Sequence, residues 1–298
     1  MRRRDPSILL PEVFLGRDAV KDGVFTAREL RGSAVKRVLR GVYTVPGVPV
    51  THRLRCKAAA LVLPEGAVVT GRSQATLLGV ELTRWEDDVQ VLCRHGDRWT
   101  TPRGVSIRRA KHVAVASVRD GVPLPGPERM AFDLTTRVGL LDAVADLDAV
   151  VRAGLVDLTR FRQWLEDVHD PHVVQAREAA ALCDPRADSR PESKLRVVLQ
   201  KAGLPVEPRW RVFDQGGRFV ARLDLALVDL QVAIEYDGEW HALREQLSED
   251  RLRLRRLRDA GWEVVHVTSR MLRDGQEIVD AVNRAIARQR LALRPLRR

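Results

Sequence analysis

The alternation of apolar and polar positions is clearest in the last third of the chain. Residues 220–228 and 231–237 each alternate with a period of two, and only Asp229 and Leu230 lie between them. A period of two is typical of β-strands, and a two-residue connection is typical of a tight hairpin turn. The pattern therefore predicts an antiparallel strand pair in which Val228 lies opposite Gln231.

Three acidic side chains share one face of this predicted hairpin. Paired residue numbers keep a constant sum, so Asp224 lies opposite Glu235, and Arg222 lies opposite Asp237. Since side chains two residues apart share a face, we expect Asp224, Glu235 and Asp237 to project together. The other face is then apolar and consists of Leu223, Leu225, Leu227, Val232, Ile234 and Tyr236.

Opposed carboxylates on neighbouring strands need a cation between them. Their Cβ atoms lie about 4.5–5.5 Å apart, and the two charges repel at that separation. Mg²⁺ or Mn²⁺ suits such a site, because a hard cation binds a few carboxylates together with waters and phosphate oxygens. The sequence therefore predicts a metal site formed by Asp224, Glu235 and Asp237.

Two predicted flanking helices carry acidic residues on their apolar stripes. Glu192 and Asp250 both occupy such positions, and a charge there is costly unless it is paired or metal-bound. We therefore expect both side chains to point toward the acidic face, with Glu192 as a catalytic or supporting residue. His241 follows the second strand by a few residues and is the candidate for proton transfer.

The first fifty residues predict a small DNA-binding unit. Residues 24–32 predict a short helix with a capping box of Thr26 and Glu29; residues 33–40 predict a second helix, and residues 41–47 a strand. This order is typical of a winged helix-turn-helix, whose second helix enters the major groove. The outer face of that helix would carry the DNA-binding residues Lys36, Arg37 and Arg40. A helical cap without DNA contact is the alternative.

The middle of the chain shows regular elements but no catalytic cluster. Strands are expected at residues 88–93, 105–108 and 112–118, the first two as a hairpin with a long loop, and residues 123–127 as a linker. His169 and His172 flank Pro171, which breaks helical spacing, so a solvated turn is expected there rather than a metal pair. Helices are expected at residues 54–63, 73–78, 128–138, 140–153, 158–168 and 173–182.

Charge favours nucleic acid as the partner. Lys and Arg number 51 against 40 Asp and Glu, giving a net charge of +11, and most of the basic residues are Arg, which binds phosphate in a bidentate manner. The helix after residue 243 carries a run of arginines, of which Arg251, Arg255 and Arg258 are expected to contact the DNA backbone. The alternative is an ordinary solvated charged face.

Other classes of protein are disfavoured. No apolar run approaches the roughly 20 residues that cross a bilayer, so no membrane partner is expected. The first apolar stretch is too short for a signal peptide, which predicts a cytoplasmic protein. The three cysteines contain no CxxC pair, which argues against a structural zinc site.

The motifs of residues 191–289 resemble those of the PD-(D/E)XK nuclease superfamily, and among its members the uncharacterised domains similar to the very-short-patch-repair endonuclease. The resemblance is carried by Glu192, by Asp224 in Arg-Leu-Asp-Leu, by Ile-Glu-Tyr-Asp-Gly-Glu-Trp-His ending at His241, by Asp250 with Arg253, and by residues 260–268. It implies a mixed sheet flanked by helices and Mg²⁺-dependent cleavage of DNA. The superfamily usually has Lys two residues after the Glu, where this chain has Asp237; His241 or Arg222 are the possible substitutes.

The N-terminal segments 25–30 and 40–47 resemble the winged helix of AbiEi-type type IV antitoxins. That resemblance implies binding to promoter DNA and repression of transcription.

These patterns together predict an α/β protein of the α+β kind. We expect a winged helix-turn-helix at residues 1–50, a mixed middle region at 51–188, and a restriction-endonuclease-like domain at 189–298 with a mixed sheet flanked by helices. The leading functional hypothesis is a Mg²⁺-dependent DNA endonuclease. A non-catalytic, antitoxin-like transcriptional regulator with a degenerate nuclease fold is the alternative, and a structural or interaction protein without a nucleic-acid role is the third.

Overall fold

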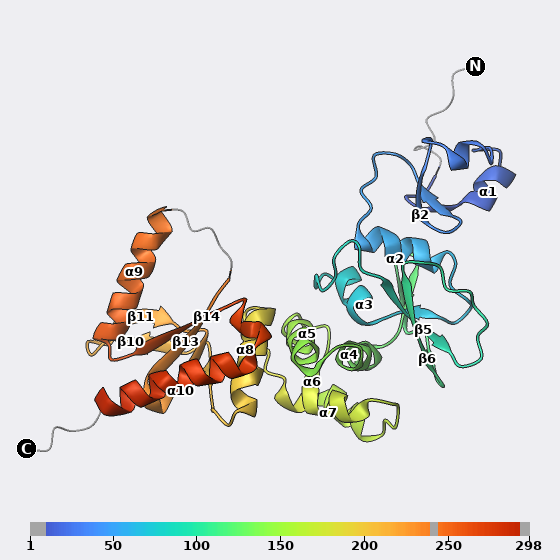
Figure 1. The fold of residues 1–298 in the computed structure, drawn as a ribbon. Coiled ribbons are helices and arrows are strands. Elements are labelled where there is room, and N and C mark those ends of the chain that lie inside the picture. Colours follow the sequence, from blue (N-terminus) through green and yellow to red (C-terminus); the bar gives the residue numbers. More distant parts are fainter. Residues whose placement is uncertain (1–9, 239–243, 293–298) are drawn as a thin grey trace, which may run out of the picture. The chain divides into compact units, whose positions relative to one another are not determined.

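The protein is a mixed α/β chain that divides into two compact units (Figure 1). The structure is a computed structural model that describes residues 10–238 and 244–292, with side chains omitted at 244–250. One unit runs up to Arg137 and includes Ala153–Ala176; the other comprises Val138–Arg152 and the chain from Arg177 onward. The α+β fold class expected from the sequence is confirmed. In the part that the structure describes, no helix is both long and apolar enough to cross a membrane.

The first unit begins with a small antiparallel sheet in the order β1-β3-β2. The capping box is confirmed: the Thr26 hydroxyl accepts a hydrogen bond from the Glu29 N–H at 3.2 Å, and the Glu29 carboxylate accepts one from the Thr26 N–H at 2.8 Å. It caps only a single 3-10 turn rather than a helix. The elements are β1 (Phe14–Leu15), α1 (Gly16–Lys21), η2 (Glu29–Arg31), β2 (Lys36–Leu39) and β3 (Val42–Thr44).

The predicted second helix at residues 33–40 is wrong. Strand β2 pairs with β3 through Lys36↔Thr44 and Arg37↔Tyr43. Gly41, with φ of +80°, permits the tight turn that brings the two strands together. A strand partner close in sequence therefore overrides the helical propensity of this segment. Lys36 and Arg37 lie on a strand and Arg40 in its hairpin turn, not on the face of a recognition helix.

The rest of the first unit has a three-stranded sheet in the order β4-β5-β6 and a β7-β8 hairpin. The helices predicted for this region are confirmed, with bounds that differ by up to three residues. Its elements are α2 (His52–Ala60), β4 (Val68–Val69), α3 (Gly71–Leu77), β5 (Val89–Arg94), β6 (Val105–Ala110), β7 (Ser117–Arg119), β8 (Val122–Leu124), α4 (Pro127–Thr136) and α6 (Leu158–Glu166).

Two strand predictions in this region are wrong. Strands β5 and β6 pair in parallel, Val89 with Val105 and Arg94 with Ala110, so they do not form a hairpin. The alternation of apolar and polar residues indicates that one face of a strand is buried, but it does not indicate whether the strand runs parallel or antiparallel to its neighbour. The strand expected at residues 112–118 is reduced to Ser117–Arg119, which pairs with β8 inside the expected linker.

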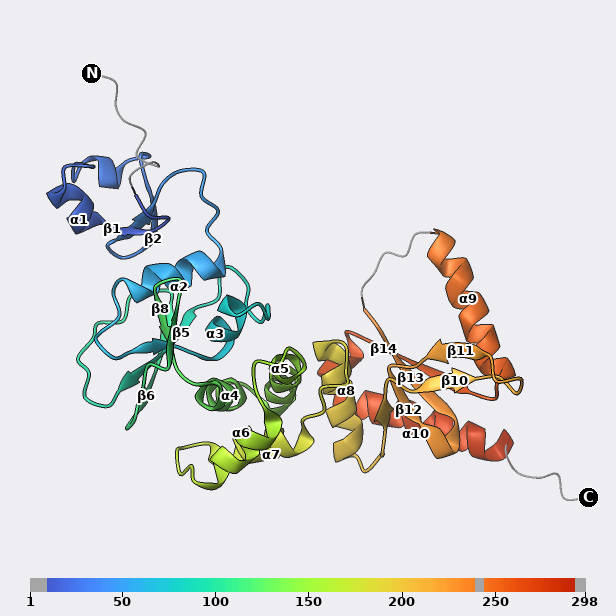
Figure 2. The ribbon, with the colours of Figure 1, turned by 180° about the vertical axis from the view of Figure 1, so that it is seen from behind.

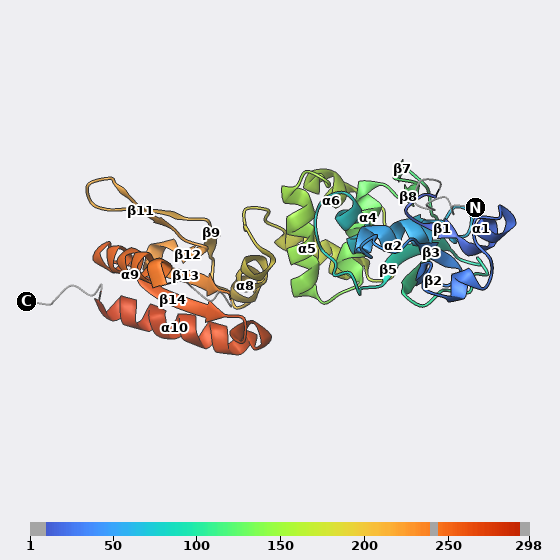
Figure 3. The same ribbon diagram turned by 90° about the horizontal axis from the view of Figure 1, so that it is seen from above.

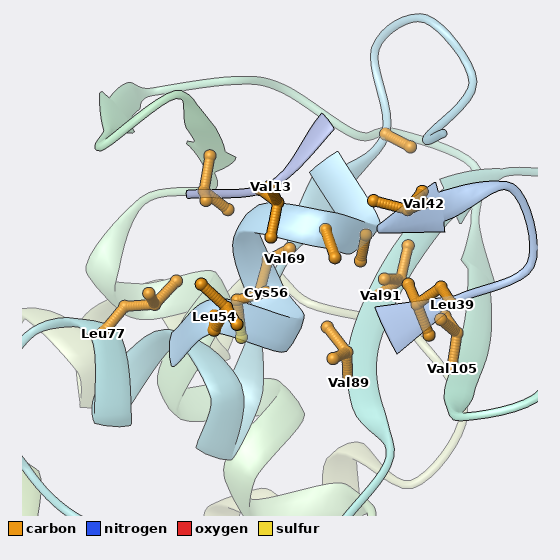
Figure 4. Close-up of a cluster of buried hydrophobic side chains, with 14 of the residues drawn as sticks. Val13, Leu39, Val42, Leu54, Cys56, Val69, Leu77, Val89, Val91 and Val105 are labelled. Atoms are coloured by element: carbon orange, nitrogen blue, oxygen red, sulfur yellow. The ribbon is translucent and has the colours of Figure 1, made fainter. Parts of the chain in front are cut away.

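One apolar core holds the N-terminal sheet and the middle sheet of this unit together (Figure 4). Leu39 and Val42 from the N-terminal sheet share this core with Cys56 of α2 and with Val89 and Val91 of β5. The expected boundary at residue 50 is therefore not a break in the core. The burial of Val42, Cys56, Val89 and Val91 is essentially complete.

The second unit is a four-stranded sheet in the order β14-β13-β12-β9 with a separate β10-β11 ribbon. Helix α7 (Val173–Leu182) crosses from the first unit into the second. The elements of the second unit are α5 (Leu140–Arg152), α8 (Arg190–Lys201), β9 (Glu207–Pro208), β10 (Arg211–Phe213), β11 (Phe219–Arg222), β12 (Leu225–Leu227), η3 (Val228–Leu230), β13 (Val232–Asp237), α9 (Arg244–Asp259), β14 (Glu263–Thr268), η4 (Met271–Arg273) and α10 (Gly275–Ala292).

The predicted hairpin register is confirmed for the strands β12 and β13. Leu225 pairs with Ile234 and Leu227 with Val232, which is the constant sum expected from the sequence. The first strand is interrupted, however, because β11 ends at Arg222 and pairs with β10 instead. Arg222 therefore lies opposite Arg211 in the ribbon, and its predicted position opposite Asp237 is wrong.

The sheet is covered on both faces by helices (Figure 2). The apolar face packs with residues of α8 and α10, and it includes the predicted Leu225, Leu227, Val232 and Ile234, with Tyr236 alongside. Leu223 instead joins the core cluster of the other face, together with Leu257 of α9, because the chain changes course at the end of β11. This interruption places Asp224 at an irregular position rather than within a strand.

A buried ion pair joins helix α5 to helix α8 in the second unit. The Arg196 side chain is 1% exposed, and its Nη2 donates to Asp148 at 2.8 Å, whose side chain is 0% exposed. Arg196 also donates to the Leu182 carbonyl at 2.6 Å, and Asp148 accepts from the Asp184 N–H at 2.8 Å. This network ties residues 138–152 to the sheet, so the second unit does not begin at residue 189 as the sequence suggested.

Replacing Arg196 by Met should destabilise α5 and α8 of the second unit without destabilising the first unit. Asp148 would then be a buried charge without a counter-ion, which costs about 3–5 kcal/mol. Hydrogen exchange should accelerate in α5 and α8 but not in α2 and α3 of the same molecule. The R196M/D148N double variant should recover part of the loss, and Lys194→Ala, which removes a partly exposed pair with Asp142, should cost less than about 1 kcal/mol. Unchanged exchange in α5 and α8 would contradict this role.

Candidate functional site

Asp224 and Glu235 meet where the interrupted strand passes β13. Asp224 lies between β11 and β12, and its Oδ2 accepts a hydrogen bond from the Tyr236 N–H at 2.9 Å. Glu235 lies within β13 and is 6% exposed. The hydrogen bond from Tyr236 fixes the Asp224 carboxylate against β13, beside the neighbouring Glu235.

Burial and mutual repulsion disfavour the charged forms of both carboxylates. Burial raises the pKa of Asp224, and the nearby charge of Glu192 raises it further, against lowering by the Tyr236 N–H. Burial raises the pKa of Glu235 to about 7, and the charges of Asp224 and Asp237 add to the rise, against lowering by Arg253. The acidic residues singled out from the sequence therefore act on one another electrostatically, which is the condition for sharing a cation.

Arg253 of α9 is the counter-ion of Glu235. Its Nη2 donates to both carboxylate oxygens of Glu235 at 2.9 Å each, and to the Arg222 carbonyl at 3.2 Å. The Arg253 side chain is 35% exposed and that of Glu235 is 8% exposed. The Arg253 side chain thus faces the acidic site.

Asp237 lies at the end of β13 and pairs with His266, a residue that the sequence analysis missed. His266 Nδ1 lies 2.9 Å from Asp237 Oδ2, and both side chains are substantially exposed. In the parallel β13-β14 pairing, His266 is the partner of Glu235. In the sequence, the alternation of His266 with Val265 and Val267 indicated only that His266 lies on the face opposite to these valines. The parallel pairing with β13 is what brings His266 to the acidic site.

Glu192 accepts hydrogen bonds that cap the start of α8. Its Oε2 accepts from the Asp188 N–H at 2.9 Å, and its Oε1 accepts from the Ser189 hydroxyl at 2.7 Å. The carboxylate of Glu192 is therefore held by the N–H group and the hydroxyl at the helix start. Glu192 reaches the site only through its charge, which acts on Asp224.

The remaining predicted residues are spread over α9 and the chain before it. Arg251, Arg255 and Arg258 are exposed on α9, as expected for a face that meets solvent or a ligand. His241 and the side chain of Asp250 lie outside the described residues. Arg222 is turned away toward Asp188, to which its Nη2 donates at 2.8 Å.

The carboxylate ligands in the described chain are too few to surround a metal ion by themselves. They fit a divalent cation that takes its other ligands from water and phosphate. Among the side chains that the structure describes, at residues 10–238 and 251–292, no group of three or more His, Cys, Asp or Glu could hold a metal ion. Asp224 and Glu235 nevertheless lie close enough for the charge of Asp224 to raise the pKa of Glu235. Mg²⁺ is commonly held by one or two carboxylates together with substrate phosphates, and Asp224 and Glu235 are the residues that would hold it here. Arg253 would have to release Glu235 when the ion binds.

Comparisons with known proteins identify relatives in mycobacteria. No protein-family model matches the chain. Over 170 residues the chain is 30% identical to "Uncharacterized protein Rv2248" and to "Uncharacterized protein MT2308" of two Mycobacterium tuberculosis strains; the match covers 56% of this chain and 62% of each relative. The RV2827C protein of Mycobacterium tuberculosis, a solved structure, gives a TM-score of 0.42 at 17% identity, over 68% of this chain and 84% of that one.

Proposed function

We propose that the second unit is a Mg²⁺- or Mn²⁺-dependent DNA endonuclease. The observation that carries this proposal is the pair of neighbouring carboxylates, the half-buried Asp224 and the buried Glu235, whose pKa values are both raised. A divalent cation between them would polarise a phosphoryl oxygen and lower the pKa of an attacking water. Fold resemblance alone cannot establish an activity, so the proposal rests on this site.

The neighbouring residues have distinct roles in this proposal. Asp224 and Glu235 hold the cation, and Asp237 holds the His266 ring by its Nδ1, which leaves Nε2 for transfer of a proton. Arg253, when released from Glu235, is placed to bind the scissile phosphate. This assignment gives the proton-transfer role to His266 in place of His241.

Basic residues in both units would bind the DNA backbone. Arg251, Arg255 and Arg258 are exposed along α9, the helix that also supplies Arg253. In the first unit, Lys36, Arg37 and Arg40 lie on the β2-β3 hairpin, which would act as a wing that contacts phosphates. We infer that the protein meets DNA in the cytoplasm, as its sequence suggested.

A non-catalytic DNA-binding regulator is the second candidate. It is favoured by the ion pair of Arg253 with Glu235 and by the use of Glu192 as a helix cap, because both satisfy acidic groups without a metal. In that case the acidic face would be a structural remnant, and the basic residues alone would determine binding.

Cleavage of supercoiled plasmid distinguishes the two candidates. With Mg²⁺ or Mn²⁺ present, the wild-type protein should nick the plasmid, and Asp224→Asn and Glu235→Gln should each lower the rate at least about 100-fold, as expected when a charge-stabilising group is lost. Asp259→Asn, a change at an exposed carboxylate of α9, is the matched control and should cleave normally. Intact plasmid with all four proteins, together with DNA binding in a shift assay, would favour the regulator.

Metal affinity should depend on pH through Glu235. Because its pKa is raised to about 7, a proton competes with the cation below that pH. The Mn²⁺ affinity should fall about tenfold per pH unit below neutrality and level off above it. Calorimetric titration between about pH 5.5 and about pH 8.5 measures this dependence. Glu235→Gln should bind weakly with no inflection near neutrality, whereas an affinity that does not change between acid and neutral pH would exclude Glu235 as a ligand.

A further inference from the structure

The β10-β11 ribbon lies apart from the four-stranded sheet (Figure 3), and one of its faces is in the core. Val212 and Ala221 pair with each other and are 2% and 3% exposed, within the cluster that also contains Leu257 of α9. Arg211, Phe213 and Arg222 take the alternate positions and face away from this core, and the register shift after Val212 pairs the exposed Phe219 with Phe213. We call these residues, with the preceding Arg209, the outer face; they are Arg209, Arg211, Phe213, Phe219 and Arg222.

Two aromatic rings on the outer face are open to solvent. Phe213 is 49% exposed and Phe219 is 54% exposed, although each would stabilise the fold more if buried. Their ring centroids lie 6.0 Å apart at an interplanar angle of 73°. The Arg211 guanidinium lies 5.5 Å from the Phe213 ring centre and 5.3 Å from that of Phe219. The outer face therefore presents π-surfaces and a cation as one cluster.

The same face is positively charged. Arg209 and Arg222 share a single acidic partner, Asp188, at 3.0 Å and 2.8 Å. Within the described chain, Arg211 has no carboxylate partner and only its contacts with the two rings. These three arginines and Phe219 line a pocket of about 540 Å³. A pocket of that size lies in the range that small ligands occupy.

The chemistry of the outer face matches a nucleic-acid strand with unpaired bases. Guanidinium groups bind phosphates, and exposed aromatic rings stack on bases. A duplex would offer this surface only its phosphates, because its bases are stacked on one another. We propose that the outer face binds single-stranded nucleic acid or an unpaired stretch within a duplex.

The outer face lies close in the chain to the acidic site. Arg222 is two residues before Asp224, and its carbonyl accepts a hydrogen bond from Arg253, the counter-ion of Glu235. A strand held on the ribbon would therefore continue to the acidic site. This inference rests on the proposed nuclease function, and it specifies the substrate as DNA that is single-stranded or locally opened.

Binding without cleavage tests the inference separately from the activity. The full-length Glu235→Gln variant in EDTA is titrated against a labelled oligothymidine of about 20 nucleotides and against a duplex of equal length, with fluorescence anisotropy as the readout. The single strand should bind at least tenfold more tightly than the duplex. Equal affinity, or tighter duplex binding, would overturn the inference, as would tight binding of an extended peptide without any binding of oligonucleotide.

Ring removal tests the role of the aromatics. F213A/F219A should weaken single-strand binding about 10- to 100-fold, as expected for lost stacking, and should change duplex binding less than about threefold. Arg211→Gln should lower both affinities and reduce the salt dependence by about one phosphate contact. Trp85→Ala, at an aromatic side chain that is 59% exposed in the first unit, is the control and should bind normally.

The possible outcomes separate the two proposals. If F213A/F219A keeps wild-type affinity for the single strand, the ribbon is not the binding surface, even if the wild-type protein cleaves plasmid. If single-strand binding depends on the rings but no metal supports cleavage, the ribbon proposal stands and the nuclease proposal fails. Unchanged duplex binding and an unchanged circular dichroism spectrum establish that F213A/F219A is folded.

Discussion

The candidate site of the second unit depends on the repulsion between two neighbouring carboxylates, Asp224 and Glu235. Asp224 and Glu235 would each be more stable in water, and burial together raises the pKa of both. In the described structure Arg253 relieves this repulsion by donating to both oxygens of Glu235. Such an arrangement costs stability unless another cation or a ligand also uses it. We interpret this cost as the signature of a binding site and not of a structural ion pair.

Helices pack on both faces of the sheet that carries these carboxylates. Apolar residues of α8 and α10 fix one face of the sheet, and α9 covers the other while supplying Arg253. The fully buried contact of Arg196 with Asp148 contrasts with the acidic site, because it joins opposite charges, and each side chain also has a backbone hydrogen bond, to Leu182 or Asp184. The acidic site instead brings several carboxylates within electrostatic reach of one another.

The sequence predicted what depends on local periodicity and missed what depends on tertiary pairing. The β12-β13 register followed from a two-residue turn, so the proximity of Asp224 and Glu235 was predictable. The interruption after Arg222 was not, because the residues before it pair with β10 through a separate turn. His266 required the parallel pairing of β13 with β14, which alternation cannot indicate. The same limitation led to the wrong helix at Lys36, where β3 supplied a strand partner.

A crystal structure obtained with Mn²⁺ would show whether the two carboxylates share a cation. We expect an anomalous scattering peak within coordination distance, about 2.0–2.3 Å, of one oxygen each of Asp224 and Glu235. We also expect the Arg253 guanidinium to have left the Glu235 carboxylate. No peak at saturating Mn²⁺, with Arg253 still bound to both oxygens of Glu235, would contradict the claim that these carboxylates share a cation.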